Sequence, residues 1–101
     1  MRIEFERSGG FMGLRQTLEL DTDEMEPNEA NEIRRMIESA DFFELPEELS
    51  GSDRTVDQYH YRLTVEYTQE YRHTIVLSDS DAPEDLQPLL RRLNLLARTR
   101  R

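Results

Sequence analysis

Alternating apolar and polar residues mark the first strands of the chain. In residues 2–7, Ile3 and Phe5 share one face and charged residues occupy the other. The same alternation returns over residues 14–20. A period of two is typical of half-buried strands, and a glycine-rich stretch separates the two runs. The pattern predicts a β-hairpin over residues 2–20.

This first hairpin has two possible registers. Pairing Ile3 with Leu18 also brings opposite charges directly across the strands. The two charge pairs are Glu6 with Arg15 and Arg2 with Glu19. Such cross-strand pairs stabilise a sheet, so the charges favour this register, with residues 9–12 as the loop. A register shifted by two residues, in which Phe5 faces Leu18, stays open.

A second hairpin is predicted further along the chain. Alternation is strongest over residues 58–67 and resumes over residues 71–77. The apolar faces coincide when Tyr67 pairs with Tyr71, which predicts a hairpin over residues 58–78. The same register sets three further pairs: Leu63 with Ile75, Thr64 with Thr74, and Glu66 with Arg72. We expect the tyrosines of the apolar face to pack in the core.

Two segments carry apolar residues at helical spacing. In residues 28–40 these residues recur every three or four positions, which predicts an amphipathic helix, and Pro46 follows it. A leucine stripe, expected to pack against the sheet, predicts a second helix over residues 83–97, with Asp81 as its N-cap. Pro88 interrupts this pattern. Either a separate short turn precedes a helix that starts near Pro88, or one helix is kinked there.

These elements define the expected fold. Their order is ββαββα, and a chain of 101 residues supports a single domain with one core, residues 1–101. We therefore expect an α+β fold. Its four-stranded, largely antiparallel sheet would carry two helices packed on one face.

Net charge narrows the range of partners. Thirteen basic and 22 acidic residues give a formal net charge of −9, which repels phosphate backbones and argues against nucleic-acid binding. The chain has no cysteine, and no segment approaches the roughly 20 apolar residues of a membrane span. With no signal-peptide pattern in its first residues, the chain is expected to be cytoplasmic and to contact neither nucleic acid nor membrane.

Residues suited to catalysis or metal binding are sparse. The two histidines, His60 and His73, fall on opposite faces of the second hairpin in the expected register, so they cannot share a metal ion. Residues 21–24 are acidic but lack the glycine and the spacing of a calcium-binding loop. The sequence groups no nucleophile with a base and an orienting residue, so we expect a non-enzyme without metal or cofactor.

The glycine-rich stretch of the first hairpin holds an unusual apolar pair. Phe11 and Met12 lie among glycines, where a turn requires glycine but not large apolar side chains. Either Phe11 folds back over the sheet edge, or the glycines present it to a partner's pocket as an interface anchor. The candidate binding site comprises Ser8, Gly9, Gly10, Phe11, Met12 and Gly13.

Several motifs resemble the emfourin family, a group of small cytoplasmic-type bacterial proteins. The most specific is the Gly-Gly-Phe-x-Gly element of residues 9–13, which follows Arg7 and Ser8. The others are Asp41-Phe-Phe-x-Leu-Pro46, Tyr59-x-Tyr61 and Pro83-x-x-Leu86. Together the motifs span nearly the whole chain, while the acidic residues 47–57 depart from the family pattern.

The resemblance implies a function. Emfourins inhibit protealysin-like members of the thermolysin family of zinc metallopeptidases. Such enzymes favour a bulky apolar side chain just after the scissile bond, and Phe11 or Met12 would suit that pocket. The carboxylates of residues 21–26 could alternatively reach the enzyme's zinc, although water competes for exposed carboxylates. The alternative function is a non-inhibitory interaction module, such as an adaptor.

Overall fold

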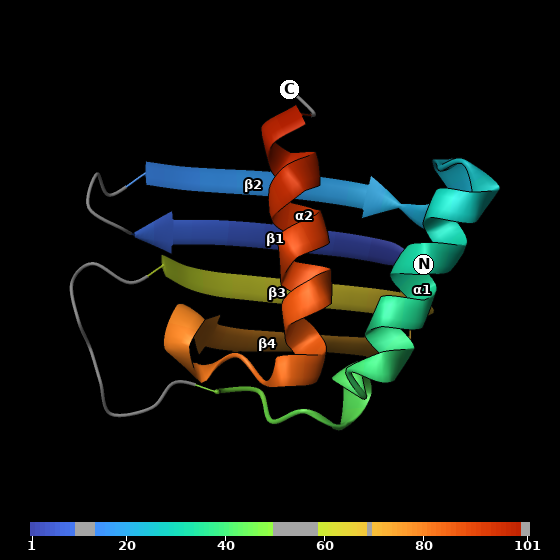
Figure 1. The fold of residues 1–101 in the computed structure, drawn as a ribbon. Coiled ribbons are helices and arrows are strands. Elements are labelled where there is room, and N and C mark those ends of the chain that lie inside the picture. Colours follow the sequence, from blue (N-terminus) through green and yellow to red (C-terminus); the bar gives the residue numbers. More distant parts are fainter. Residues whose placement is uncertain (10–13, 50–58, 69, 100–101) are drawn as a thin grey trace.

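The computed structural model describes residues 1–9, 14–49, 59–68 and 70–99, and these residues contain the expected elements in the expected order (Figure 1). The strands are β1 (Arg2–Gly9), β2 (Leu14–Asp21), β3 (Tyr59–Thr68) and β4 (Tyr71–Ser78). The α-helices are α1 (Pro27–Ser39) and α2 (Gln87–Thr99). Short 3-10 helices connect them: η1 (Thr22–Glu24), η2 (Phe42–Glu44), η3 (Asp79–Asp81) and η4 (Glu84–Leu86).

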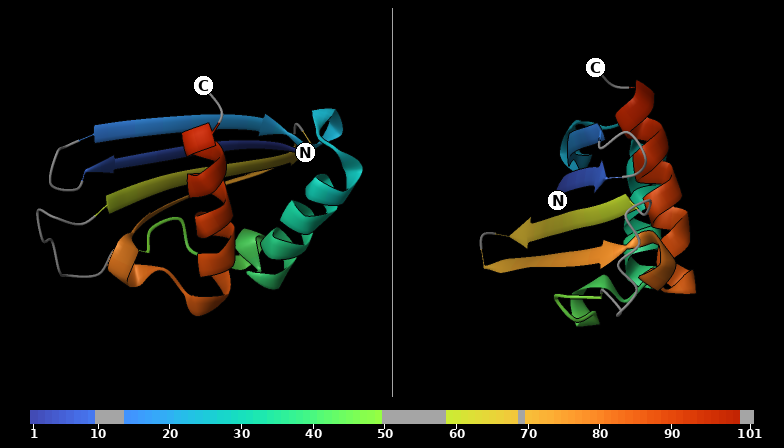
Figure 2. Two further views of the ribbon diagram at one scale, coloured as in Figure 1. Left: turned by 45° about the horizontal axis from the view of Figure 1, so that its top comes forward. Right: turned by 90° about the vertical axis from the view of Figure 1, so that its left-hand side faces the viewer.

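The four strands form one antiparallel sheet in the spatial order β2-β1-β3-β4. Both helices lie on the same face of this sheet, and α2 crosses the strands (Figures 1 and 2). The expected α+β class, strand number and one-sided helix packing are therefore confirmed.

The core lies between the sheet and the two helices. Its largest fully buried side chains are Phe5, Phe42, Ile3, Leu20, Ile33, Leu63, Ile75, Leu77, Leu86, Leu89, Leu93 and Val65. Three of these leucines belong to η4 and α2, so the leucine stripe packs against the sheet, as expected from the amphipathic pattern.

Helix α1 begins where its sequence provides both a suitable backbone and a cap. Pro27 occupies the first turn, where its fixed φ suits a helix and its missing N–H is not needed. Glu26 Oε2 accepts a hydrogen bond from Glu29 N at 3.1 Å, which satisfies one of the free N–H groups of this turn. Ile33 and Ile37, four residues apart, then face the core.

The first hairpin adopts the register that the charge pattern disfavoured. Phe5 pairs with Leu18, and the last pair before the turn is Gly9 with Leu14. The expected pairing of Ile3 with Leu18 is therefore wrong. Both expected charge pairs still form, but diagonally across the strands: Arg15 with Glu6 and Arg2 with Glu19. Diagonal neighbours are within reach of long side chains, so charge pairs do not distinguish registers that differ by two residues.

The second hairpin keeps the expected register over most of its length. The confirmed pairs are Leu63 with Ile75, Thr64 with Thr74, and Glu66 with Arg72. Near the turn, a β-bulge between Glu66 and Thr68 places Tyr71 opposite Thr68, so the expected pairing of Tyr67 with Tyr71 is wrong. A bulge adds one unpaired residue to a strand and shifts every pair beyond it.

The tyrosines of this hairpin divide between the core and the surface. Tyr61 is buried in the core and Tyr59 is half-buried. Tyr67 and Tyr71 are instead 58% and 52% exposed, so their expected place in the core is wrong. Both lie at the turn end of the hairpin, where the end of α1 and η2 cover them only in part.

Helix α2 starts at Gln87, after the separate short helix η4. This agrees with the first alternative for Pro88, a short turn followed by a new helix. Asp81 is not the N-cap, because η4 follows Pro83 and has no side-chain cap. Asp81 Oδ2 instead accepts a hydrogen bond from Ser78 Oγ at 2.6 Å, within the preceding turn η3.

Residues 47–49 lie along the outer edge of β4. Val76 N donates to Glu47 O at 2.8 Å, and Leu49 N donates to Val76 O at 2.8 Å. Part of the segment that departs from the family motifs thus pairs with the sheet. At the opposite edge, no strand of the described residues pairs with the outer side of β2.

Tyr61 gives the fold a dependence on alkaline pH. Its hydroxyl donates to Asp79 Oδ1 at 2.7 Å. Burial, and then this hydrogen bond, raise the pKa of the Tyr61 hydroxyl above its usual value. A raised pKa favours the neutral phenol in the folded state. The stability gained is therefore full below about pH 10, the usual tyrosine pKa, and is lost as the pH rises further.

We expect the Tm to fall more steeply above about pH 10 in the unaltered protein than in Tyr61→Phe, which has no proton to lose there. Thermal unfolding followed by circular dichroism across this range measures both slopes. Parallel slopes would show that Tyr61 does not link folding to pH.

Candidate functional site

The structure places the first two residues of the predicted site, Ser8 and Gly9, at the end of the central strand β1. Gly9 has a φ of 93°, in the left-handed region that favours glycine. The chain therefore leaves β1 in a conformation that a β-carbon would oppose. Gly10, Phe11, Met12 and Gly13 lie outside the described residues, so the predicted binding site stays a prediction.

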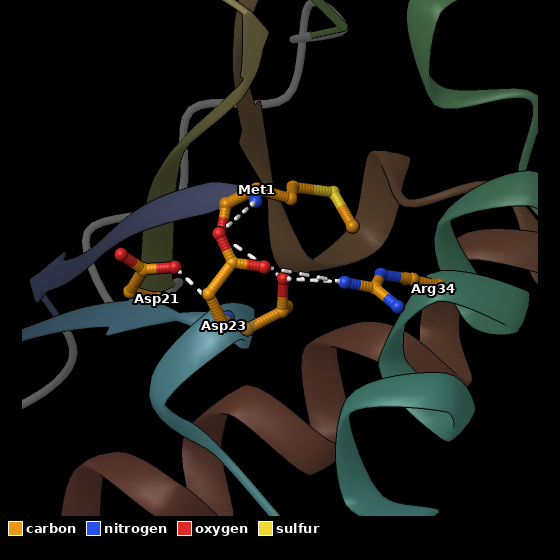
Figure 3. A network of polar contacts seen from close by, with 5 residues as sticks. Met1, Asp21, Asp23 and Arg34 are labelled. Atoms are coloured by element: carbon orange, nitrogen blue, oxygen red, sulfur yellow. Dashed lines mark hydrogen bonds and ion pairs between the residues drawn. The ribbon is translucent and has the colours of Figure 1, made fainter. Parts of the chain in front are cut away.

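A polar cluster lies at the opposite end of the β1–β2 hairpin (Figure 3). Asp23 Oδ2 is 4.0 Å from the α-amino nitrogen of Met1, and Asp23 Oδ1 is 3.6 Å from Arg34 Nη2. Arg34 Nη2 also donates to Thr22 Oγ1 at 3.2 Å. These contacts join Met1, which precedes β1, to η1 and α1. We call this group, with Asp21, the Asp23 cluster.

The turn after β2 fixes the backbone that carries Asp23. Asp21 Oδ1 accepts a hydrogen bond from Asp23 N at 2.9 Å and caps η1. Thr22 is buried, and its N–H and hydroxyl both donate to Met1 O, at 2.9 and 3.2 Å. The side chain of Asp23 is nevertheless 75% exposed. The result is an accessible carboxylate on a well-supported backbone.

This carboxylate is free to exchange its partners. Exposed ion pairs contribute about 0–1 kcal/mol each, so a stronger ligand can displace them. Carboxylate oxygens bind Zn²⁺ at roughly 2.0–2.2 Å, and a catalytic zinc keeps one coordination position open. The described residues contain no group of three potential ligands that could hold a metal ion by themselves. The Asp23 cluster can therefore offer an oxygen ligand to a metal that another protein holds.

The two histidines lie on opposite faces of the sheet, as the register predicted. His60 is exposed on the polar face. His73 pairs with the buried Val65, and its Nε2 lies 2.7 Å from the carbonyl oxygen of Leu45. This hydrogen bond gives the partly buried ring of His73 a polar partner, so the ring has a structural role.

Sequence reasoning missed a pocket where the end of α1 meets the turn end of β3 and β4. It has a volume of about 370 Å³. Residues that line it include Met1, Arg34, Asp41, Phe43, Tyr67 and Tyr71. We call it the aromatic pocket. The sequence feature that could have revealed this pocket is the pair of consecutive phenylalanines after the first helix. Only one of two adjacent side chains on a short turn can enter the core, so the other is left to line the surface. Phe42 is buried, and Phe43 lines the pocket.

The chain is therefore a small α+β protein whose surface carries the exposed Asp23 cluster and the aromatic pocket. The chain belongs to the Emfourin family, whose model matches residues 5–94 and confirms the resemblance found in the motifs. Membership of this family supports a role in metallopeptidase inhibition. No curated protein and no solved structure matches the chain. No helix in the described part of the chain has both the length and the apolar character needed to cross a membrane.

Proposed function

We propose that this protein inhibits a thermolysin-like zinc metallopeptidase. The observation that carries the proposal is membership of the Emfourin family across residues 5–94. The Asp23 cluster adds support from the described structure, because its accessible carboxylate suits the open position of a catalytic zinc. The partner is then a peptidase whose zinc lies at the base of a cleft that a hairpin end can enter.

The β1–β2 hairpin offers a contact surface at each end. Strands of eight residues are about 26 Å long at roughly 3.3 Å per residue. A standard interface covers about 800 Å² of each partner and is therefore about 30 Å across, so one peptidase can contact both ends. The zinc and the pocket beside the scissile bond are adjacent in the enzyme. Only one end of the hairpin can occupy them.

We propose that the peptidase contacts both ends. Asp23 reaches the zinc, and the tip formed by residues 8–13 places Phe11 in an apolar pocket of the enzyme. The alternative arrangement puts Phe11 in the pocket beside the scissile bond and leaves Asp23 at the rim of the interface. The two arrangements differ in one measurable respect, because only the first makes the contribution of Asp23 depend on the metal.

Asp23→Asn is expected to weaken inhibition at least about tenfold, equivalent to about 1.4 kcal/mol, because it removes the charge that favours binding to zinc. The inhibition constant against a thermolysin-like peptidase measures this effect. Asp85→Asn removes the same charge from an exposed position in η4 and serves as the matched control, with an unchanged inhibition constant expected.

Binding to the zinc-free peptidase, measured by calorimetry, separates the two arrangements. If Asp23 meets the zinc, Asp23→Asn and the unaltered protein bind the zinc-free enzyme equally well. A loss that persists without zinc assigns Asp23 to the rim. If the protein binds the peptidase without inhibiting it, the function is that of an adaptor, and if it does neither, the proposed function is wrong.

A further inference from the structure

The aromatic pocket contains partly exposed rings that pack against the core. Phe43 stacks on Tyr71, with ring centroids 4.5 Å apart and planes inclined by 29°. Phe43 also meets the buried Phe42 edge-on at 5.5 Å, which ties the stack to the core. Tyr67 and Tyr71 are both more than half exposed. Exposed aromatic faces attract cations through the negative potential of the ring.

The rim of the pocket is negatively charged. Glu38, Asp41 and Glu44 line it, and none of the ion pairs among the described residues involves them. Two lining residues carry a positive charge, Arg34 and Met1 through its α-amino group, and both already pair with Asp23. The C-terminal end of α1 also lies here, with no basic residue in its last turn. This end carries the negative pole of the helix dipole. The dipole and the three rim carboxylates therefore all favour the binding of a cation.

We propose that the aromatic pocket binds an arginine side chain of a protein partner. A guanidinium is planar and weakly hydrated, so it can stack on a ring while its N–H groups donate to carboxylates at the rim. The ammonium of lysine is more strongly hydrated and cannot stack in this way. The volume of about 370 Å³ falls within the usual range of ligand pockets, roughly 300–1,000 Å³.

The pocket adjoins the surface proposed for the peptidase. Met1 and Arg34 line it and also contact Asp23. A peptidase that contacts Asp23 would therefore bring its own surface side chains to the pocket, and this assignment of the arginine to the peptidase rests on the proposed function. The recognition of arginine does not rest on the proposed function, because it follows from the rings and charges of the pocket alone.

A titration followed by NMR tests the recognition without any peptidase. Nα-acetyl-arginine amide is added to the ¹⁵N-labelled full chain, and Nα-acetyl-citrulline amide, which has nearly the same shape but no charge, is the control ligand. We expect saturable shifts at Phe43, Tyr67 and Tyr71 with a Kd of the order of millimolar, as for small ligands. Citrulline should bind at least about fivefold more weakly, equivalent to about 1 kcal/mol of cation–π attraction.

Variants then assign the effect to the pocket. Tyr71→Leu keeps an apolar side chain but removes the ring, and we expect a two- to fivefold weaker Kd, the range of an exposed cation–π contact of about 0.5–1 kcal/mol. Asp41 has a φ of 50°, and asparagine tolerates this left-handed conformation, so Asp41→Asn removes the charge without altering the turn. It should also weaken binding, whereas Asp85→Asn should not.

Two results would overturn the inference. One is equal affinity for the arginine and citrulline amides, and the other is no shift at the pocket residues with tens of millimolar arginine amide. Neither result bears on inhibition. Conversely, a protein that binds the arginine amide but inhibits no peptidase would retain this inference and lose the proposed function.

Discussion

Leu63→Ala is expected to lower the free energy of unfolding by about 2–5 kcal/mol. Leu63 is fully buried on β3, where it pairs with Phe5 of β1 and Ile75 of β4. The substitution removes buried apolar atoms and leaves a cavity that a sheet fixed on both sides cannot fully close. Urea denaturation followed by circular dichroism measures the loss, with the midpoint and slope compared at one protein concentration.

Leu95→Ala is the matched control for this prediction. It is the same chemical change on α2, at a position that is 49% exposed. We expect a change within about 0.5 kcal/mol, because surface substitutions of this kind have small effects. A loss below about 0.5 kcal/mol for Leu63→Ala would contradict its central place in the core and the strand pairing that puts it there.

Phe11→Ala is expected to weaken inhibition of the peptidase by roughly thirtyfold or more. Truncation of a buried interface anchor costs at least about 2 kcal/mol, which corresponds to this factor. The Tm should change little, because we expect the tip to contact the partner and not the core. Inhibition constants and Tm values measured on the same samples separate a loss of binding from a loss of folding.

Gly10→Val tests the glycine frame of the tip while Phe11 stays present. A β-branched residue resists positive φ, so this variant should distort the tip and weaken inhibition with Tm nearly unchanged. The contrary result for Phe11→Ala is a lowered Tm with full inhibition by the protein that remains folded. That result would show that Phe11 covers the core as a lid. The Asp23 cluster would then be the remaining contact surface of the hairpin.

The first hairpin shows what kinds of sequence signal decide a register. Alternation assigns each residue to a face, but it leaves registers that differ by two equally possible. The observed register pairs Ile3 with Leu20 and Phe5 with Leu18. The charge-based register would instead have set Phe5 opposite Gln16. Burial of apolar area contributes about 25 cal/mol per Å², whereas an exposed ion pair contributes about 0–1 kcal/mol, so the apolar pairs were the more reliable guide.

The second hairpin and the pocket show where sequence patterns stop being informative. The pattern of period two predicted the pairing of Leu63 with Ile75 correctly. It could not predict the bulge beside Glu66, because an extra residue in one strand leaves the alternation of the other unchanged. The alternation also carries no information on how far the helices cover the sheet, so it could not predict the exposure of Tyr67 and Tyr71 or the aromatic pocket. For the same reason, the Asp23 cluster required the fold, since Arg34 reaches Asp23 from a separate helix.

The two edges of the sheet differ in whether another strand can be added. The bonds of Val76 to residues 47 and 49 occupy the outer edge of β4 near its C-terminal end, so an incoming strand cannot pair along its full length there. In the described residues, β2 leaves its outer edge unpaired. Two copies that joined through β2 would leave only the partly occupied edges of β4 exposed. A strand added there could not pair along the full length of β4, which disfavours the fibrous aggregation that long exposed edge strands promote.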